Sequence, residues 1–140
     1  MAVKVKVVQR FNPQKKDEEK KFYAQSSVTG TVTLATLARR IANASMAARG
    51  DVLGVLTSLV DQIIESLEEG NSVKLGDLGS MRVSVSSKGV ATKEEVTAGN
   101  IKQTRIIYTP STMLKTRLNG ISFKLVKVDE KKDEEPPTEL

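Results

Sequence analysis

The chain of 140 residues contains no cysteine, no histidine and no tryptophan. Without cysteine it can form no disulfide, no thiolate nucleophile and no cysteine-ligated metal site. Without histidine it lacks the usual general base and the commonest metal ligand of proteins. No pair of its carboxylates has a spacing suited to acid–base catalysis. These absences predict a protein that is not an enzyme, with no catalytic residue, no cofactor, no metal site and no small-molecule substrate.

Long apolar runs and aromatic side chains are also scarce. No stretch is long enough to span a bilayer, and residues 1–30 lack the pattern of a signal peptide, so we expect a cytoplasmic protein without membrane contact. The aromatic residues are two tyrosines and three phenylalanines. The core must therefore be built from valine, isoleucine, leucine, methionine and alanine. Such a core is thin, and the pairing of two chains would thicken it.

The formal net charge of +5 combines two unlike regions. Residues 129–140 contain six acidic side chains and two lysines, a net −4, whereas residues 1–128 contain 20 basic and 11 acidic side chains, a net +9. We expect residues 129–140 to be an acidic disordered tail, because they are too charged and too rich in proline to fold alone. A basic body suits a polyanion such as nucleic acid, since each neutralised phosphate releases counterions. Simple solubility explains the charge equally well.

Residues 1–30 have the pattern of a β-hairpin. Val3, Val5 and Val7 alternate with lysines and predict a strand over residues 1–10. A second strand is predicted over residues 21–28, after a charged loop with a turn at Asn12-Pro13. We therefore expect an N-terminal β-hairpin extension with a long loop.

Two helices are predicted next, over residues 32–44 and from about residue 51 to Gly70. Thr33 is the expected N-cap of the first helix, and Gly70 the left-handed C-terminal cap of the second. Gly54 lies inside the second helix at a cost of about 1 kcal/mol relative to alanine, so we expect close packing around it. The broad apolar stripe of the second helix predicts that it packs on the first helix and on a second copy of itself.

The segment after Gly70 predicts two strands, over residues 72–75 and 80–86, joined by the turn Gly-Asp-Leu-Gly. The polar residues that follow are typical of a projecting arm. Thr92 and Glu95 have the spacing of a capping box there, which favours a short helical turn over residues 93–96.

Strand character returns over residues 105–108. Thr109 and Pro110 then predict the N-cap and the first residue of a third helix, which ends near Asn119. Residues 121–128 alternate again and predict a final strand that packs on the N-terminal extension.

This order of elements resembles the bacterial histone-like HU and integration host factor DNA-binding family. The matching segments are ESLEEGNSVKLGDLGSMRV, residues 65–83, and IIYTPSTMLKTRL, residues 106–118. The resemblance implies an α+β fold with a two-helix N-terminal hairpin, a β-hairpin with a projecting arm and a short C-terminal helix, assembled as an intertwined homodimer. The HU-like DNA-binding domain would occupy residues 31–120, and the N-terminal hairpin and C-terminal strand would be additions to a divergent member.

The same resemblance implies that a homodimer binds double-stranded DNA in the nucleoid as an architectural protein with little sequence preference. Phosphates would bind the hairpin turn and the helix N-termini, and the arms would enter the minor groove. The DNA-binding positions implied in the arm are Lys88, Lys93, Lys102 and Arg105. Those implied at the turn and at the helix starts are Gly79, Ser80, Arg82, Thr109, Ser111, Lys115, Thr31 and Thr33.

Three departures from the family pattern predict weaker binding and less bending. Asp77 replaces the first glycine of the turn and puts a negative charge beside a phosphate site. The arm contains no proline, so the wedge that the family inserts between base pairs is missing. Glu94 and Glu95 lie where the family arm is strongly basic.

Two other interpretations stay open. The arm cations are also explained by a solvated surface. For Arg39, Arg40 and Arg49, exposure on solvated helix faces is a better explanation than DNA contact. The alternative function is a protein–protein interaction scaffold that keeps the HU-like dimer but has weak or no DNA binding. Its partners would add strands at exposed edges over residues 3–8 or 123–128.

Overall fold

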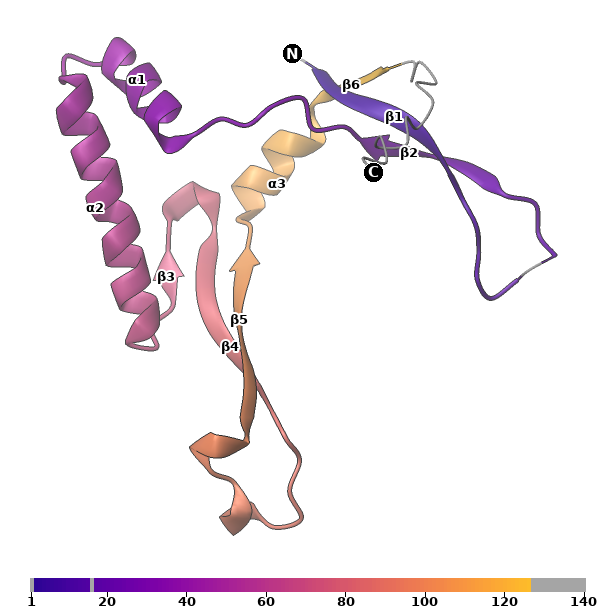
Figure 1. Ribbon diagram of the computed structural model, residues 1–140. Helices are drawn as coiled ribbons and strands as arrows, with labels where there is room; N and C mark the ends of the chain where they lie inside the picture. Colours follow the sequence, from indigo (N-terminus) through magenta and orange to yellow (C-terminus); the bar gives the residue numbers. More distant parts are fainter. Residues whose placement is uncertain (1, 16, 127–140) are drawn as a thin grey trace, which may run out of the picture. The chain divides into compact units, whose positions relative to one another are not determined.

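The computed structural model describes residues 2–15 and 17–126, which form two compact units (Figure 1). The first unit combines the described residues of 1–31 and 120–140, and the second is Val32–Asn119. The predicted acidic tail lies outside the described residues, as do the last two residues of the predicted strand over 121–128. None of the helices in the described ranges combines the length and the apolar character that a bilayer crossing requires.

The first unit is a three-stranded sheet in the order β2-β1-β6. Strand β1 (Ala2–Arg10) pairs antiparallel with β2 (Lys21–Ser26) and parallel with β6 (Ser122–Leu125). The predicted hairpin is thus confirmed. The expectation of an exposed edge over residues 3–8 is only partly met, because Val5 pairs with both β2 and β6, whereas residues 6–8 pair with β2 alone among the described residues. The final strand predicted to pack on the N-terminal extension is β6 in its described part, and it pairs with β1. The parallel register joins distant parts of the sequence, so no local pattern could predict that register.

Two packed helices open the second unit, α1 (Leu34–Ala44) and α2 (Arg49–Glu68). Thr33 is the N-cap of α1, as predicted: its Oγ1 accepts a hydrogen bond from the Thr36 backbone N–H at 3.2 Å. Gly70 has φ +84° after the end of α2, where its N–H donates to the Leu67 carbonyl at 3.0 Å. The predicted glycine stop is confirmed.

The apolar stripe of α2 is covered only in part. Among the described residues the buried apolar side chains are Ala38, Val52 and Leu67, whereas Leu59 is 49% exposed. A Cβ on Gly54 would meet no heavy atom within 4 Å. The close packing predicted at this glycine is therefore wrong within the single chain.

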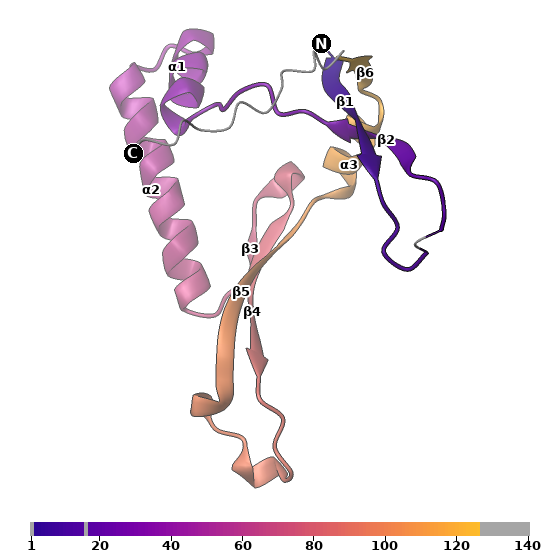
Figure 2. The same ribbon diagram turned by 45° about the vertical axis from the view of Figure 1, so that its right-hand side comes forward.

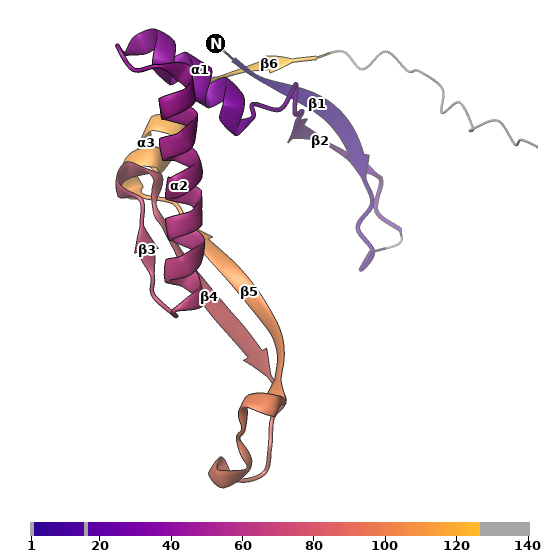
Figure 3. The same ribbon diagram turned by 60° about the vertical axis from the view of Figure 1, so that its left-hand side comes forward.

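The sheet of the second unit has the order β3-β4-β5, all antiparallel (Figure 2). Its strands are β3 (Val73–Lys74), β4 (Ser80–Ser87) and β5 (Ile101–Thr109), and the short 3₁₀ turn η1 (Gly76–Leu78) joins the first two. The β4–β5 ladder continues beyond the end of α2 as a projecting arm (Figure 3).

The tip of the arm contains two 3₁₀ turns, η2 (Lys93–Glu95) and η3 (Ala98–Asn100). The short helical turn predicted over residues 93–96 is confirmed by η2, but Thr92 makes no capping hydrogen bond there. A capping box is present five residues later instead, between Thr97 and Asn100.

The third helix, α3 (Thr112–Asn119), begins two residues later than predicted. Thr109 remains in the β5 strand, paired with Ser80 of β4, so it cannot cap the helix. Ser111 is the N-cap: its Oγ accepts from the Leu114 N–H at 3.1 Å, and its carbonyl accepts from the Lys115 N–H at 3.1 Å.

Candidate nucleic-acid interface

Most of the polar site residues predicted on β4 and β5 lie on one face of the ladder. Side chains directly opposite each other in a ladder share a face, and successive side chains alternate between faces. The register pairs Ser80 with Thr109 and with Lys74 of β3, and Ser84 with Arg105. This face, called the polar face below, carries Lys74, Ser80, Arg82, Ser84, Ser86, Gln103, Arg105 and Thr109, with Ile107 as its one apolar member opposite Arg82.

The opposite face of the same ladder is apolar. Apart from Thr104, which pairs with Val85, the residues of this face are apolar: Val73, Met81, Val83, Val85, Ile106 and Tyr108. Val85 is 54% exposed and Ile106 is 65% exposed. The alternation of β4 and β5 therefore separates cationic side chains from an uncovered apolar surface, here called the apolar ladder face.

Gly79 brings the turn between β3 and β4 against the start of α3. It is buried, with φ +120°, a conformation that L side chains rarely adopt. A Cβ at this position would lie 2.2 Å from the Thr109 carbonyl oxygen and 2.8 Å from the Pro110 Cα. Only glycine permits this close approach.

Two side-chain hydrogen bonds hold the turn and α3 together. The Ser111 hydroxyl donates to the Asp77 carbonyl, and the Tyr108 hydroxyl donates to the Leu78 carbonyl. The Ser111 hydroxyl thus donates its proton to the turn and accepts a hydrogen bond from the Leu114 N–H. Its hydroxyl positions the site, and the donors left for a ligand are the backbone N–H groups at the start of α3.

The turn and the helix start together form one surface pocket of about 280 Å³. Its lining contains residues predicted at the hairpin turn and residues predicted at the start of the third helix. It also contains Lys74, which was not among the predicted positions. The register that places Lys74 opposite Ser80 is the signal that identifies it, and the sequence alone does not give that register. The pocket is lined by Lys74, Gly76, Gly79, Ser80, Thr109, Pro110 and Ser111.

The arm cations are exposed but do not converge on one point. The Lys88 N–H donates to the Asn100 carbonyl at 2.8 Å and closes the arm, and Lys93 shares a 3₁₀ turn with two glutamates. Lys102 lies at a bulge, where the pairing shifts between Ser86 and Ser87. In the described part of the chain none of these cations forms an ion pair, and the ion pair present there is Lys15–Glu18.

The remaining predicted positions are Lys115, exposed one helical turn after Ser111, and the pair at the first helix. Thr33 uses its hydroxyl as the N-cap and belongs to the second unit, whereas Thr31 belongs to the first. The two threonines therefore do not form one site within a unit.

Two arginines assigned to solvated helix faces line a common pocket of about 210 Å³, together with Ala35 and Thr36. They are Arg39, three residues after Thr36 on α1, and Arg49, the first residue of α2. The i, i+3 spacing from Thr36 to Arg39 is the sequence signal for this grouping. The described residues contain no group of three or more carboxylates that could hold a metal ion.

Comparisons with known proteins place these features in context. A family model described as "HU domain fused to wHTH, Ig, or Glycine-rich motif" matches residues 1–125. No protein with a curated description matches the chain.

Two solved structures share the fold. One is a candidate bacterial DNA-binding protein from Bacteroides vulgatus ATCC 8482, with 17% identity and a TM-score of 0.60 over 89% of this chain and 48% of that one. The chain thus spans about half the length of this relative. The other is Anabaena HU in a cocrystal with DNA, with 15% identity and a TM-score of 0.51 over 64% of this chain and 99% of that one.

Proposed function

Because this chain belongs to the family of HU domains fused to a wHTH, Ig or glycine-rich motif, we propose that it binds double-stranded DNA. It does so as a non-enzymatic architectural protein of the nucleoid, through phosphate contacts and with little sequence preference. The α+β, HU-like fold predicted from the sequence is confirmed by the two solved structures. One of them is itself an HU protein bound to DNA.

The polar face of the β4–β5 ladder is the observation that carries the proposal. It places Lys74, Arg82 and Arg105 on one side of the sheet without an acidic side chain among them. Arginine and lysine neutralise phosphates, and each neutralised phosphate releases counterions and adds affinity. A surface of this kind binds the backbone of a duplex whatever its sequence.

The pocket beside Gly79 supplies a second type of phosphate contact. The first backbone N–H groups of α3 have no partner within the helix, and the positive end of the helix dipole favours an anion there. Lys74 lines the same pocket and adds a positive charge. Asp77 lies in the neighbouring 3₁₀ turn, and its carboxylate lowers the affinity of this part of the site.

Uncovered apolar side chains favour a homodimer. The apolar ladder face and the stripe of α2 are too exposed for a chain that stays alone in water. Burying one such valine, leucine or isoleucine contributes roughly 1.5–3 kcal/mol. A further apolar pocket of about 310 Å³ between α1 and α2, lined by residues that include Ile41, Val52 and Val55, offers room for side chains of a second copy.

The arm is suited to follow the duplex rather than to kink it. Its exposed side chains include Lys93 and Lys102, and it contains no proline that could act as a wedge. We therefore place DNA condensation ahead of sharp bending among its effects.

A double substitution on the polar face tests the proposal. R82Q/R105Q removes two charges from this face, and R40Q/R117Q removes two exposed arginines elsewhere in the second unit. We expect the slope of log K against log salt for duplex binding to fall by about 2 per chain in R82Q/R105Q, with little change in the control. Equal slopes in both variants would contradict the assignment of this face to DNA.

A further inference from the structure

The β2-β1-β6 sheet of the first unit also has two unlike faces. Its register places Val3 opposite Phe123, and Val7 opposite Ala24. One face is therefore mostly apolar and carries Val3, Val5, Val7, Phe22, Ala24, Phe123 and Leu125, together with Gln9 and Ser26. The other face, called the basic face below, carries Lys4, Lys6, Val8, Arg10, Lys21, Tyr23, Gln25 and Lys124.

The basic face is the side that a sheet of this composition turns to solvent. A sheet with one apolar and one polar face packs through the apolar one. Phe22 is 68% exposed and Phe123 is 65% exposed, so the apolar face still has surface to bury. Lys4 and Lys6 are exposed on the opposite side.

Ordinary solvation does not explain the charges of this face. Solvated surfaces mix both signs, but the three strands contain five cations and no aspartate or glutamate. Lysines often protect the edges of sheets from unwanted pairing. Lys4 pairs with Lys124 of β6, and its carbonyl accepts from the Ser27 N–H on the other side, so there is no edge to protect at this lysine; Lys6 pairs with β2 alone within the described ranges.

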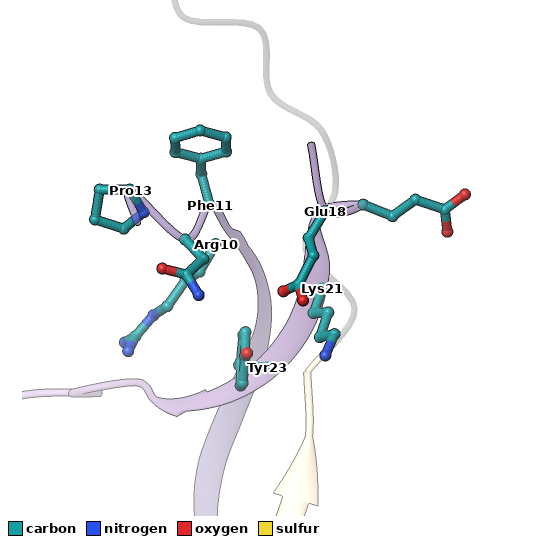
Figure 4. Close-up of a pocket in the computed structure, with 8 residues that line it drawn as sticks. Arg10, Phe11, Pro13, Glu18, Lys21 and Tyr23 are labelled. Atoms are coloured by element: carbon teal, nitrogen blue, oxygen red, sulfur yellow. The ribbon is translucent and has the colours of Figure 1, made fainter. Parts of the chain in front are cut away.

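The cations of this face are also free of ion pairs within the described residues. Arg10 lies over the ring of Tyr23 at 5.9 Å, which places both side chains on the same side of the sheet. Arg10, Lys21 and Tyr23 further line a pocket of about 390 Å³ with Glu18 and Glu19 (Figure 4). Glu18 and Glu19 thus reduce the positive charge at the end of the sheet next to the hairpin loop. The positive charge without nearby carboxylates lies at Lys4, Lys6 and Lys124.

We propose that the basic face is a second DNA-binding surface, which contacts duplex phosphates independently of the polar face of the β4–β5 ladder. This inference rests on the proposed function. Alternate residues of a strand are about 6.6 Å apart and neighbouring strands about 4.8 Å apart, so Lys4, Lys6 and Lys124 present a compact group of ammonium charges. An open face of lysines, without a groove for side chains, suits the repeated charges of a phosphate backbone.

A second surface changes what one molecule does to DNA. The first unit and the HU-like unit each contact phosphates, so the chain either covers a longer stretch of one duplex or holds two duplexes together. Both outcomes add phosphate contacts and steepen the dependence of binding on salt.

The test compares two double variants of the full chain with the same change in charge. K4Q/K6Q removes two lysines of the basic face, and K15Q/K20Q removes two lysines of the hairpin loop in the same unit. We expect the salt slope of duplex binding to fall by about 2 per chain in K4Q/K6Q and to stay near the unmodified value in K15Q/K20Q. K4R/K6R restores the charge and is expected to restore the slope.

The other possible outcomes overturn either this inference or the proposed function. An unchanged slope in folded K4Q/K6Q would overturn the inference and leave the proposed function standing, and would fit lysines that pair with an anion such as the chain's own acidic tail. An equal fall in K15Q/K20Q would also overturn it, since net charge alone would then explain the loss. Failure of the unmodified chain to bind any duplex at low salt would instead overturn the proposed function. If K4Q/K6Q does not fold by circular dichroism, K124Q compared with K20Q decides the question in the same way.

Discussion

At the scale of single residues, Gly79 fixes the geometry of the candidate interface. Its positive φ and its contact with the Thr109 carbonyl oxygen join the turn to the start of α3. Ser111 and Tyr108 then fasten the same junction by hydrogen bonds to turn carbonyls. The pocket lined by Lys74 exists because these three residues hold its two walls together.

The substitution Gly79→Ala tests this role. The added Cβ would collide with backbone atoms that cannot move independently, and alanine is strained at this φ. We expect a loss of about 2 kcal/mol or more in the free energy of unfolding, measured in urea. Gly89→Ala is the matched control, because a Cβ there meets nothing within 4 Å, and its unfolding free energy should be nearly unchanged. Equal stabilities of the two variants would contradict the close approach.

Residue positions were predictable from the sequence where the interaction is local. Thr33 caps the start of α1 and Gly70 caps the end of α2, each through a hydrogen bond to a residue three positions away, and both caps were predicted correctly. Ser111 was assigned to phosphate rather than to its capping role because Thr109-Pro110 offers a locally good helix start. The pairing of Thr109 with Ser80, 29 residues earlier in the sequence, displaces that start. The roles proposed for the DNA-binding residues stay predictions.

At the scale of elements, α2 has one face that the single chain does not cover. Its apolar residues recur with the helical period, yet only Val52 and Leu67 among them are buried. Gly54 fits the same account, since the space around it is open within the chain. A second copy packed on α2 would bury this face.

The substitution Leu59→Asp tests the dimer. A carboxylate buried in an apolar interface costs several kcal/mol, so we expect dissociation to monomers, or loss of the fold, in sedimentation velocity experiments. Ser58→Asp places the same charge one residue earlier, on the polar side of α2, and should leave the dimer intact. A monomeric unmodified chain, or a dimer that survives Leu59→Asp, would contradict this arrangement.

Helices and hairpins were easier to predict than the elements that pack or pair with them in the fold. The periods of α1 and α2 and the alternation of β1 and β2 are present in short stretches of sequence. The position of β1 at the centre of a sheet depends on β6, more than 110 residues later. The two faces of both sheets follow from registers of this kind, so the sequence could indicate basic strands but not which lysines share a face.

At the scale of the whole molecule, the two units divide the basic residues between them. The polar face of the β4–β5 ladder belongs to the HU-like unit, and the basic face belongs to the sheet of the first unit. The family model spans residues of both units. Both cationic faces lie opposite apolar ones, so assembly through apolar surfaces would leave the cations facing solvent and available to DNA.

The salt dependence of duplex binding by the unmodified full chain is the direct test of whether the protein binds DNA through phosphate contacts. Affinity would be measured from about 50 to 200 mM salt on two duplexes of equal length and unrelated sequence. The account predicts a steep linear fall of log K against log salt, with a slope of the same size for both duplexes, because phosphates supply the affinity. A folded protein that shifts neither duplex at low salt, or that binds with no dependence on salt, would contradict it.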